Sequence, residues 1–106
     1  MAKFVLLYSG GSMPETETEQ AEVLQAWTTW YNELGSAVVD PGNPFTPMAK
    51  SIMSDGTVSD GPIGIPASGY TIIEADSLDE AIDMARDCPV LESGAHISAY
   101  ETFNVM

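Results

Sequence analysis

Residues 2–8, with the sequence AKFVLLY, form an apolar segment that constrains the fold more than any other feature of the chain. Apolar and aromatic side chains over this length predict a β-strand. Successive side chains of a strand point to opposite faces, and both alternating sets are apolar here. One set is Phe4, Leu6 and Tyr8, and the other is Val5 and Leu7. A strand with water on one face would alternate more cleanly, so we expect both faces to be covered.

A first helix is predicted after this strand. Thr16 and Glu19 have the spacing of a capping box, in which a side-chain oxygen accepts a hydrogen bond from the backbone three residues on. Residues 19–34 then repeat apolar side chains every three or four positions, and Gly35 supplies a helix end. The repeated residues are Val23, Leu24, Trp27, Trp30, Tyr31 and Leu34.

A second helix begins at another capping box, Ser77 with Glu80, and ends at Pro89. Its spacing places four apolar residues toward the interior of the protein. These residues are Leu78, Ala81, Ile82 and Ala85.

Three further strands are predicted over residues 36–40, 68–75 and 95–105. The three prolines of residues 41–47 predict an irregular loop between the first two. Asp55-Gly56 predicts the tight turn of a small hairpin in the same interval.

The resulting order is strand, helix, strand, hairpin, strand, helix, strand. Two helices cannot cover both faces of a four-stranded sheet, so both should lie on one face, as in the ferredoxin-like split βαβ arrangement of α+β proteins. The other face still needs a cover, and a second copy of the chain can supply it. We therefore predict one domain over residues 1–106, with an extra hairpin, that forms a homodimer with its sheets packed face to face.

The charge of the chain argues against several classes of partner. Sixteen acidic residues against three basic ones, Lys3, Lys50 and Arg86, give a formal net charge of −13 at pH 7. Nucleic acids and anionic membranes are both bound by clustered Lys and Arg. We expect neither as a partner, and we attribute the acidic charge to solubility.

The remaining composition argues against targeting segments, cofactors and metals. No apolar run approaches the roughly 20 residues of a membrane span, and the N-terminus lacks the features of a signal peptide, so we expect a cytoplasmic protein. The single Cys88 cannot form an internal disulfide, and His96 is the only histidine, which excludes the usual zinc sites. Without a phosphate-binding loop or a dinucleotide fingerprint, we expect no cofactor.

Five segments that together cover most of the chain carry a family resemblance. They are FVLLYSG at 4–10, AWTTWYNELGSAVVDPGNP at 26–44, SDGP at 59–62, GYTIIEADSLDEAIDMARDCPVL at 69–91 and ISAYETF at 97–103. In order and spacing they resemble the YCII-related (YciI-like, DGPF-type) domain family of the dimeric α+β barrel superfamily, although Ile63 stands where the family has Phe. The resemblance implies the fold and the homodimer. Some relatives resemble hydratases or dehydrochlorinases with a His–Asp pair, but their histidine lies earlier in the chain than His96, so we do not expect that mechanism.

Three residues are candidates for acid/base catalysis: His96, Asp60 and Asp40. Histidine titrates nearest neutrality, so His96 is the obvious general acid or base. Asp60 and Asp40 could each supply a carboxylate to a cleft. Each residue also has a structural interpretation, because Asp before Gly or Pro forms tight turns, and a histidine in a strand is commonly held by a hydrogen bond.

Four residues are candidates for binding a substrate: Tyr8, Ser9, Tyr100 and Trp27. Tyr8 and Ser9 end the first strand at an edge where a ligand could enter, and a phenol can donate a hydrogen bond to a ligand oxygen. Tyr100 shares one face of the last strand with His96. The helical spacing of Trp27 favours packing in the core, and Cys88 is predicted to be buried and unreactive.

The function favoured by these residues is binding of an unidentified small molecule in a cleft between sheet and helices. Cofactor-free acid/base chemistry of the lyase or isomerase kind could accompany it. Two other classes remain open: a non-catalytic ligand-binding or regulatory module, and a cofactor-free monooxygenase-like enzyme. A pocket that joins His96 to an Asp favours catalysis, scattered polar residues favour the module, and an apolar pocket lined by Trp favours the oxygenase.

Overall fold

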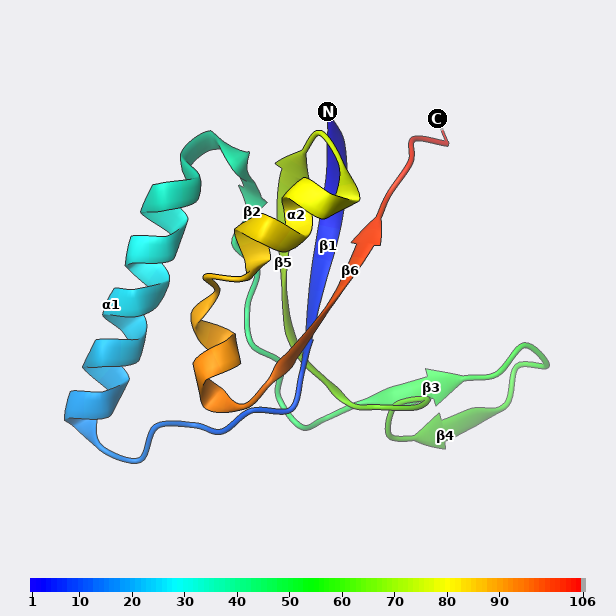
Figure 1. Ribbon diagram of the computed structural model, residues 1–106. Helices are drawn as coiled ribbons and strands as arrows, with labels where there is room; N and C mark the ends of the chain where they lie inside the picture. The colour runs from blue at the N-terminus through cyan, green and yellow to red at the C-terminus, as the bar shows by residue number, and fades with distance from the viewer. Residues whose placement is uncertain (106) are drawn as a thin grey trace.

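The computed structural model describes residues 1–105, and Met106, the last residue of the predicted domain, lies outside the described part. Strands and helices follow in the order β1 (Ala2–Ser9), α1 (Glu17–Leu34), η1 (Gly35–Ala37), β2 (Val38–Asp40), β3 (Lys50–Ile52), β4 (Val58–Asp60), β5 (Ala67–Ala75), α2 (Leu78–Ala85), η2 (Pro89–Ser93) and β6 (His96–Glu101). The elements η1 and η2 are short 3-10 helices. Figure 1 shows their arrangement.

The main sheet is antiparallel and has the strand order β2-β5-β1-β6. β5 lies between β1 and β2, which are the two strands that α1 connects, so the βαβ unit is split. This is the ferredoxin-like order, and it confirms the predicted fold class. β3 and β4 form a separate two-stranded sheet, which is the extra hairpin.

The core lies on one face of the main sheet, where both helices pack. Phe4 and Leu6 of β1 and Ile73 of β5 are completely buried there. Trp30 of α1 and Ala81 of α2 belong to the same buried cluster. Burying a side chain such as Phe4 or Leu6 contributes about 1.5–3 kcal/mol, so this face supplies most of the apolar stabilisation that the described chain contains.

No helix of residues 1–105 packs on the opposite face of the sheet, which we call the bare face. The strand register places Val5 opposite Ile72 and Tyr100, and Leu7 opposite Tyr70. The bare face consists of Lys3, Val5, Leu7, Ser9, Tyr70, Ile72, Glu74, His96, Ser98 and Tyr100. The second apolar set of β1 is thus only half-buried within the chain.

The helix starts agree with the sequence motifs, but α2 ends at Ala85 and not at Pro89, which begins η2. Thr16 Oγ1 accepts a hydrogen bond from the backbone N–H of Glu19, and Ser77 Oγ accepts one from that of Glu80, both at 3.1 Å. Each bond pairs one of the backbone donors that a helix N-terminus leaves free. Gly35 follows α1 with φ of 57°, a conformation that favours glycine. None of the helices in the described residues combines the length and apolar character needed to cross a membrane.

The last strand is shorter than predicted, because it ends at Glu101 and not at residue 105. Glu101 pairs with Phe4 of the antiparallel β1, and the backbone N–H of Thr102 donates to the carbonyl of Lys3. β1 itself begins at Ala2, so residues beyond 102 have almost no strand left to pair with. The strand predicted over 36–40 also starts late, because residues 35–37 form η1.

Two apolar helix faces are less buried than the spacing predicts. In α2, Ala81 and Ala85 are buried, but Leu78 and Ile82 are 44% and 36% exposed. In α1, the apolar residues of the N-terminal half, Val23 and Leu24, are exposed, whereas Trp30 in the second half is buried. Helical spacing identifies the apolar side of a helix, but it does not say how far the sheet beneath extends.

Candidate functional site

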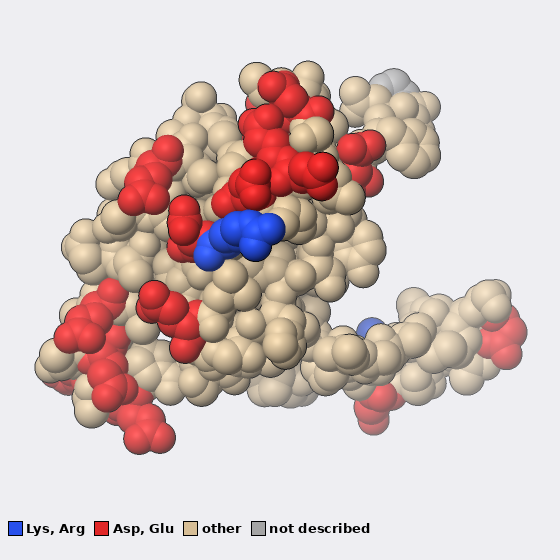
Figure 2. Space-filling model, in the orientation of Figure 1, with Lys and Arg blue, Asp and Glu red and all other residues tan. Residues whose placement is uncertain are grey.

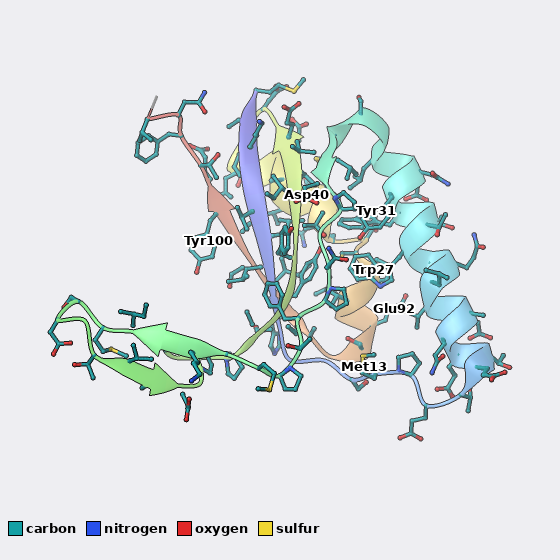
Figure 3. The ribbon with its side chains drawn as sticks, turned by 180° about the vertical axis from the view of Figure 1, so that it is seen from behind. Met13, Trp27, Tyr31, Asp40, Glu92 and Tyr100 are labelled. Carbon is teal, nitrogen blue, oxygen red and sulfur yellow. The ribbon has the colours of Figure 1, made fainter. Side chains whose placement is uncertain are left out.

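Four aromatic side chains gather between α1 and the main sheet, and we call them the aromatic cluster: Tyr8, Trp27, Trp30 and Tyr31. Trp27 lies at its centre, because its ring centroid is 5.8 Å from that of Tyr8, 5.7 Å from Trp30 and 5.6 Å from Tyr31. Positions 27, 30 and 31 share one helix face. Tilted and edge-to-face pairs at such distances are favourable. Figure 3 shows Trp27 and Tyr31 on the side of α1 that faces the sheet.

A chain of hydrogen bonds borders this cluster. The Cys88 thiol donates to the hydroxyl of Tyr8 at 3.7 Å, and that hydroxyl donates to Thr71 Oγ1 at 2.6 Å. The Thr71 hydroxyl donates to the carbonyl of Pro41 at 3.0 Å, and the Tyr31 hydroxyl donates to the same carbonyl at 3.1 Å. The side chains that end in the core therefore have their polar atoms paired, as buried polar groups require.

Three groups of this chain are protonated at neutral pH, and burial keeps them protonated to higher pH than usual. Desolvation raises the pKa of the Tyr8 phenol, the Tyr31 phenol and the Cys88 thiol above their ordinary values. A protonated phenol or thiol can donate a hydrogen bond. It is a poor general base and a poor nucleophile, because both tasks need the deprotonated or otherwise activated form.

The cluster is partly open to solvent at Trp27 and Tyr31. Both rings are half-buried, whereas Tyr8 and Trp30 are buried. The indole N–H of Trp30 donates to the carbonyl of Met84 at 3.0 Å, while that of Trp27 has no hydrogen-bond partner among residues 1–105. Trp27 therefore offers a partly accessible ring and a free donor to a ligand.

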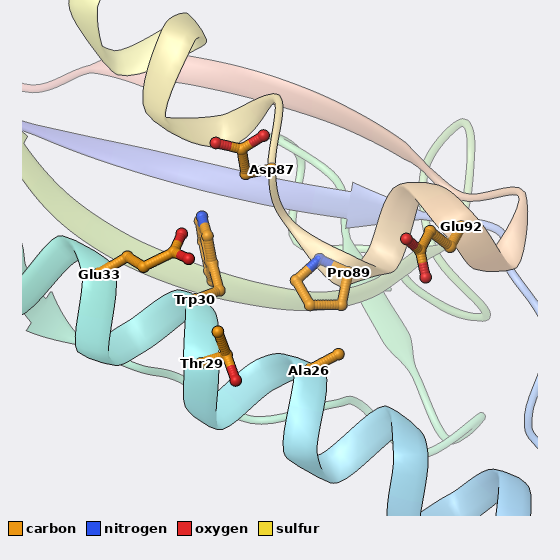
Figure 4. A pocket seen from close by; sticks show the side chains of 7 residues that line it. All are labelled: Ala26, Thr29, Trp30, Glu33, Asp87, Pro89 and Glu92. Carbon is orange, nitrogen blue, oxygen red and sulfur yellow. The ribbon is translucent and has the colours of Figure 1, made fainter.

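A groove with a volume of about 400 Å³ lies beside the cluster, between α1 and η2, with Trp30 as one wall. Figure 4 shows its lining, to which α1 contributes Ala26, Thr29, Trp30 and Glu33, and the segment after α2 contributes Asp87, Pro89 and Glu92. The lining contains three carboxylates and no Lys or Arg. Within residues 1–105, no three His, Cys, Asp or Glu side chains are grouped so that they could hold a metal ion.

The predicted substrate-binding residues divide between the two faces of the sheet. Tyr8 and Trp27 belong to the aromatic cluster. Ser9 lies on the bare face, directly opposite His96 in the register of β1 and β6. Tyr100 lies farther along the same face, opposite Val5, and is 57% exposed (Figure 3).

The three predicted acid/base residues lie apart. Asp40 ends β2, where it accepts hydrogen bonds from the backbone of Gly42 at 2.9 Å and from the Tyr70 hydroxyl at 3.0 Å. This is a turn of the kind that Asp before Pro can form. His96 lies in β6, at the opposite edge of the sheet, three strand spacings or about 14 Å away.

Asp60 lies on the hairpin formed by β3 and β4. Its side chain is 93% exposed and 3.5 Å from Lys50 Nζ. Gly61 follows with φ of 87°, so SDGP forms the corner at which the chain leaves the hairpin. His96 itself borders a smaller cavity of about 290 Å³ beside Arg86, with no aspartate in its lining. Neither this cavity nor the groove beside the aromatic cluster joins His96 to an Asp.

Three residues of the site were not among the sequence candidates, namely Trp30, Tyr31 and Thr71. Trp30 lies about one helical turn from Trp27. Tyr31 could have been found, because it follows Trp27 by one helical turn. Thr71 could have been suspected, because it lies in the inward set of β5, between Gly69 and Ile73, where a hydroxyl needs a buried partner.

The comparisons with known proteins support the fold. No family model matches the chain, and no curated protein matches it. Among solved structures, the chain is similar to 5-chloro-2-hydroxyhydroquinone dehydrochlorinase (TftG) from Burkholderia phenoliruptrix AC1100, in complex with 2,5-dihydroxybenzoquinone. The TM-score is 0.56 and the identity 16%, over 95% of this chain and 93% of that one. This likeness confirms the α+β, ferredoxin-like fold, and membership of the YCII-related family stays a prediction.

Proposed function

We propose that the chain binds a small, uncharged ring compound at the aromatic cluster. The observation that carries this proposal is Trp27, a half-buried indole packed between Tyr8 and Tyr31 with a free N–H. A flat ring can pack against the face of such a side chain, or lie at its edge and accept a hydrogen bond from its N–H. Ligand sites are commonly apolar and aromatic, with few polar groups that set the orientation.

The charge distribution supports a neutral ligand. The three basic residues lie elsewhere: Lys3 on the bare face, Lys50 on the hairpin and Arg86 at the end of α2. Figure 2 shows acidic side chains spread over the helix side of the molecule around a single basic patch. An anionic ligand would meet this acidic surface, on which Arg86 already pairs with Asp83 at 3.3 Å. The excess of acids lowers both its association rate and its affinity.

The similar solved structure supports a flat ring that carries oxygen atoms. That dehydrochlorinase was solved with 2,5-dihydroxybenzoquinone, and its chain has the same fold. We propose binding without acid/base catalysis for this chain, because Tyr8, Tyr31 and Cys88 remain protonated and His96 is remote from Asp40.

We propose further that a second copy of the chain covers the bare face. Val5, Leu7 and Ile72 are only half-buried there, although a strand facing water would place polar residues at these positions. Two sheets packed face to face through such side chains form a core about 10 Å thick. A homodimer is the simplest symmetric way to build it.

Calorimetric titration with two matched probes tests the ligand proposal. Resorcinol is a neutral dihydroxybenzene, and 3,5-dihydroxybenzoate is the same ring with a carboxylate. We expect resorcinol to bind with a Kd of about 0.1–1 mM, in keeping with the affinity per atom of small ligands. We expect no measurable binding of the benzoate. Absence of resorcinol binding, or equal binding of both probes, contradicts the proposal.

Two variants locate the site. Trp27→Leu should abolish resorcinol binding, because it removes both the ring and the donor. Leu24→Ala is the matched control on the same helix, at a side chain that is 69% exposed, and it should bind like the wild type. Thermal unfolding of each variant verifies that it folds. Recovery of resorcinol unchanged after incubation supports binding without catalysis, whereas conversion into a new product contradicts it.

A further inference from the structure

The hairpin of β3 and β4 projects from the rest of the protein, and we call residues 49–61 the arm. Figures 1 and 3 show it extending from the end of the main sheet past the β6 edge. The backbone N–H of Gly61 donates to the carbonyl of Ala49 at 2.9 Å, so the two ends of the arm lie side by side. The arm is thus a local two-stranded unit with a narrow base.

A free two-stranded hairpin is marginally stable in water, and it gains stability from a third strand or from packing. The arm does have internal supports. Asp55 Oδ1 accepts from the N–H of Thr57 at the turn, and the Ser51 hydroxyl donates to the carbonyl of Gly61 at 2.7 Å. These bonds fix the shape of the arm but bury almost no apolar surface.

The two faces of the arm differ in character. Ile52 pairs with Val58 on one face, and their side chains are 72% and 57% exposed. Ser51 pairs with Ser59 on the other face. Lys50 pairs with Asp60 on the same face, nearer the base of the arm. The segment that leaves the arm exposes Ile63 and Ile65 at 69% and 81%. Four exposed aliphatic side chains on and next to one projecting hairpin favour a surface that another protein covers.

Charge favours a second copy as that protein. Every copy carries a formal charge of −13, so two copies repel each other overall. They can associate most easily through surfaces that carry few acids. The bare face carries Lys3 with one acid, Glu74, and the arm carries Lys50 with two acids, Asp55 and Asp60. Together they hold two of the three bases but only three of the sixteen acids. The helix side carries a dense array of acids (Figure 2). The bare face and the arm are therefore the surfaces at which two copies repel each other least.

We propose that the arm contacts a second copy of this chain, namely the copy that covers the bare face. In this contact, which we call the clasp, the Ile52–Val58 face packs against the side of that copy. This inference rests on the homodimer proposed above. In a symmetric dimer each arm holds the other protomer, so the apolar contact is made twice. The arm then adds a second contact that helps to fix how the two sheets are rotated against each other.

Sedimentation velocity over a range of protein concentrations tests the clasp. The double variant Ile52→Asp/Val58→Asp should raise the dimer Kd roughly a hundredfold, because it charges two side chains that association would bury. Ser59→Asp is the control on the opposite face and should stay within about threefold of the wild type. A third variant replaces residues 50–60 by a short glycine-rich turn between the adjacent ends, and it should weaken the dimer as strongly.

The outcomes separate the clasp from the homodimer. A wild-type dimer that loosens in both arm variants supports the clasp. A dimer that stays as tight without the arm contradicts the clasp and leaves the homodimer intact. A wild-type monomer at micromolar concentration contradicts both. Resorcinol binding is measured independently of these results.

Trypsin provides a second readout, because it cuts after Lys and Arg and the arm contains one such residue, Lys50. Its side chain is 73% exposed in the single chain. We expect cleavage after Lys50 to slow at least tenfold as the protein concentration rises through the dimer Kd, because a clasped arm opens less often. A cleavage rate that does not change with concentration contradicts the clasp.

Discussion

The hydrogen bond between Tyr8 and Thr71 makes a sharp test of the buried side of the site. Tyr8 is 4% exposed and Thr71 is fully buried, and their oxygens are 2.6 Å apart. Thr71→Val removes the acceptor and keeps nearly the same shape, so the Tyr8 hydroxyl is left buried without its partner. We expect a loss of about 1–3 kcal/mol in the free energy of unfolding.

Tyr8→Phe should cost less. It removes the donor, while the Thr71 hydroxyl still donates to the carbonyl of Pro41. The loss should be about 0.5–1.5 kcal/mol, the net value of one ordinary hydrogen bond. In the double variant two apolar side chains face each other, so its loss should fall short of the sum by about 1 kcal/mol or more.

Urea unfolding of the four proteins at one fixed concentration measures this coupling, since association would otherwise change the apparent stability. The m-values should remain equal, which shows that the variants change stability and not compactness. If the losses of the two single variants sum to the loss of the double variant within about 0.3 kcal/mol, the hydrogen bond between Tyr8 and Thr71 is refuted.

Two further predictions concern the loop after β2 and the alkaline limit of stability. Gly42→Ala should lower the free energy of unfolding in urea by more than about 2 kcal/mol, because φ is +72° and a Cβ would lie 1.7 Å from the carbonyl oxygen of Tyr70. The control Gly35→Ala places a Cβ where no atom lies within 4 Å, and it should cost about 1 kcal/mol. Equal losses would disprove the close approach. Stability should also fall as the pH rises above 9.0, the ordinary pKa of a thiol, because the buried Cys88 thiol has a raised pKa and the unfolded chain loses this proton first. Cys88→Ala should move the onset toward pH 10.0, where the Tyr8 phenol of the unfolded chain begins to ionise, and an unchanged onset would exclude Cys88 as the cause.

Local motifs in the sequence predicted local structure well. The hydroxyls of Thr16 and Ser77 cap the two helices, and the Asp55-Gly56 turn closes the hairpin as predicted. Each of these features depends on residues within four positions of one another, so the sequence contains all of the partners. The order of the elements then left few ways to build one sheet, and the ferredoxin-like order was among them.

The faces of the elements were harder to predict. Leu78 and Ile82 have the same spacing as the buried Ala81 and Ala85, yet they remain exposed. Ile52 and Val58 alternate like core residues, yet they lie on the arm. An apolar pattern predicts that a surface is buried. It does not predict whether the residues that bury it belong to the same chain or to another one.

The site was only partly predictable for a similar reason. Tyr8 was chosen because it ends a strand, and Trp27 because it lies on the apolar stripe of a helix. Their rings do pack together, with centroids 5.8 Å apart. The carbonyl of Pro41, which receives two of the buried hydrogen bonds, is a backbone group that no residue type reveals. His96 and Asp40 were each chosen as acid/base candidates for their chemistry, but the strand order places them at opposite edges of the sheet.

The proposed binding at Trp27 is tested most directly by the two indole N–H signals in a two-dimensional NMR spectrum, since the chain contains two tryptophans. Trp27→Phe assigns them. On titration with resorcinol, the Trp27 signal should shift and saturate, because its N–H is free to meet the ligand. The Trp30 signal, whose N–H is bonded to Met84, should move much less. A Trp27 signal that stays in place up to several times the expected Kd would contradict binding at the aromatic cluster.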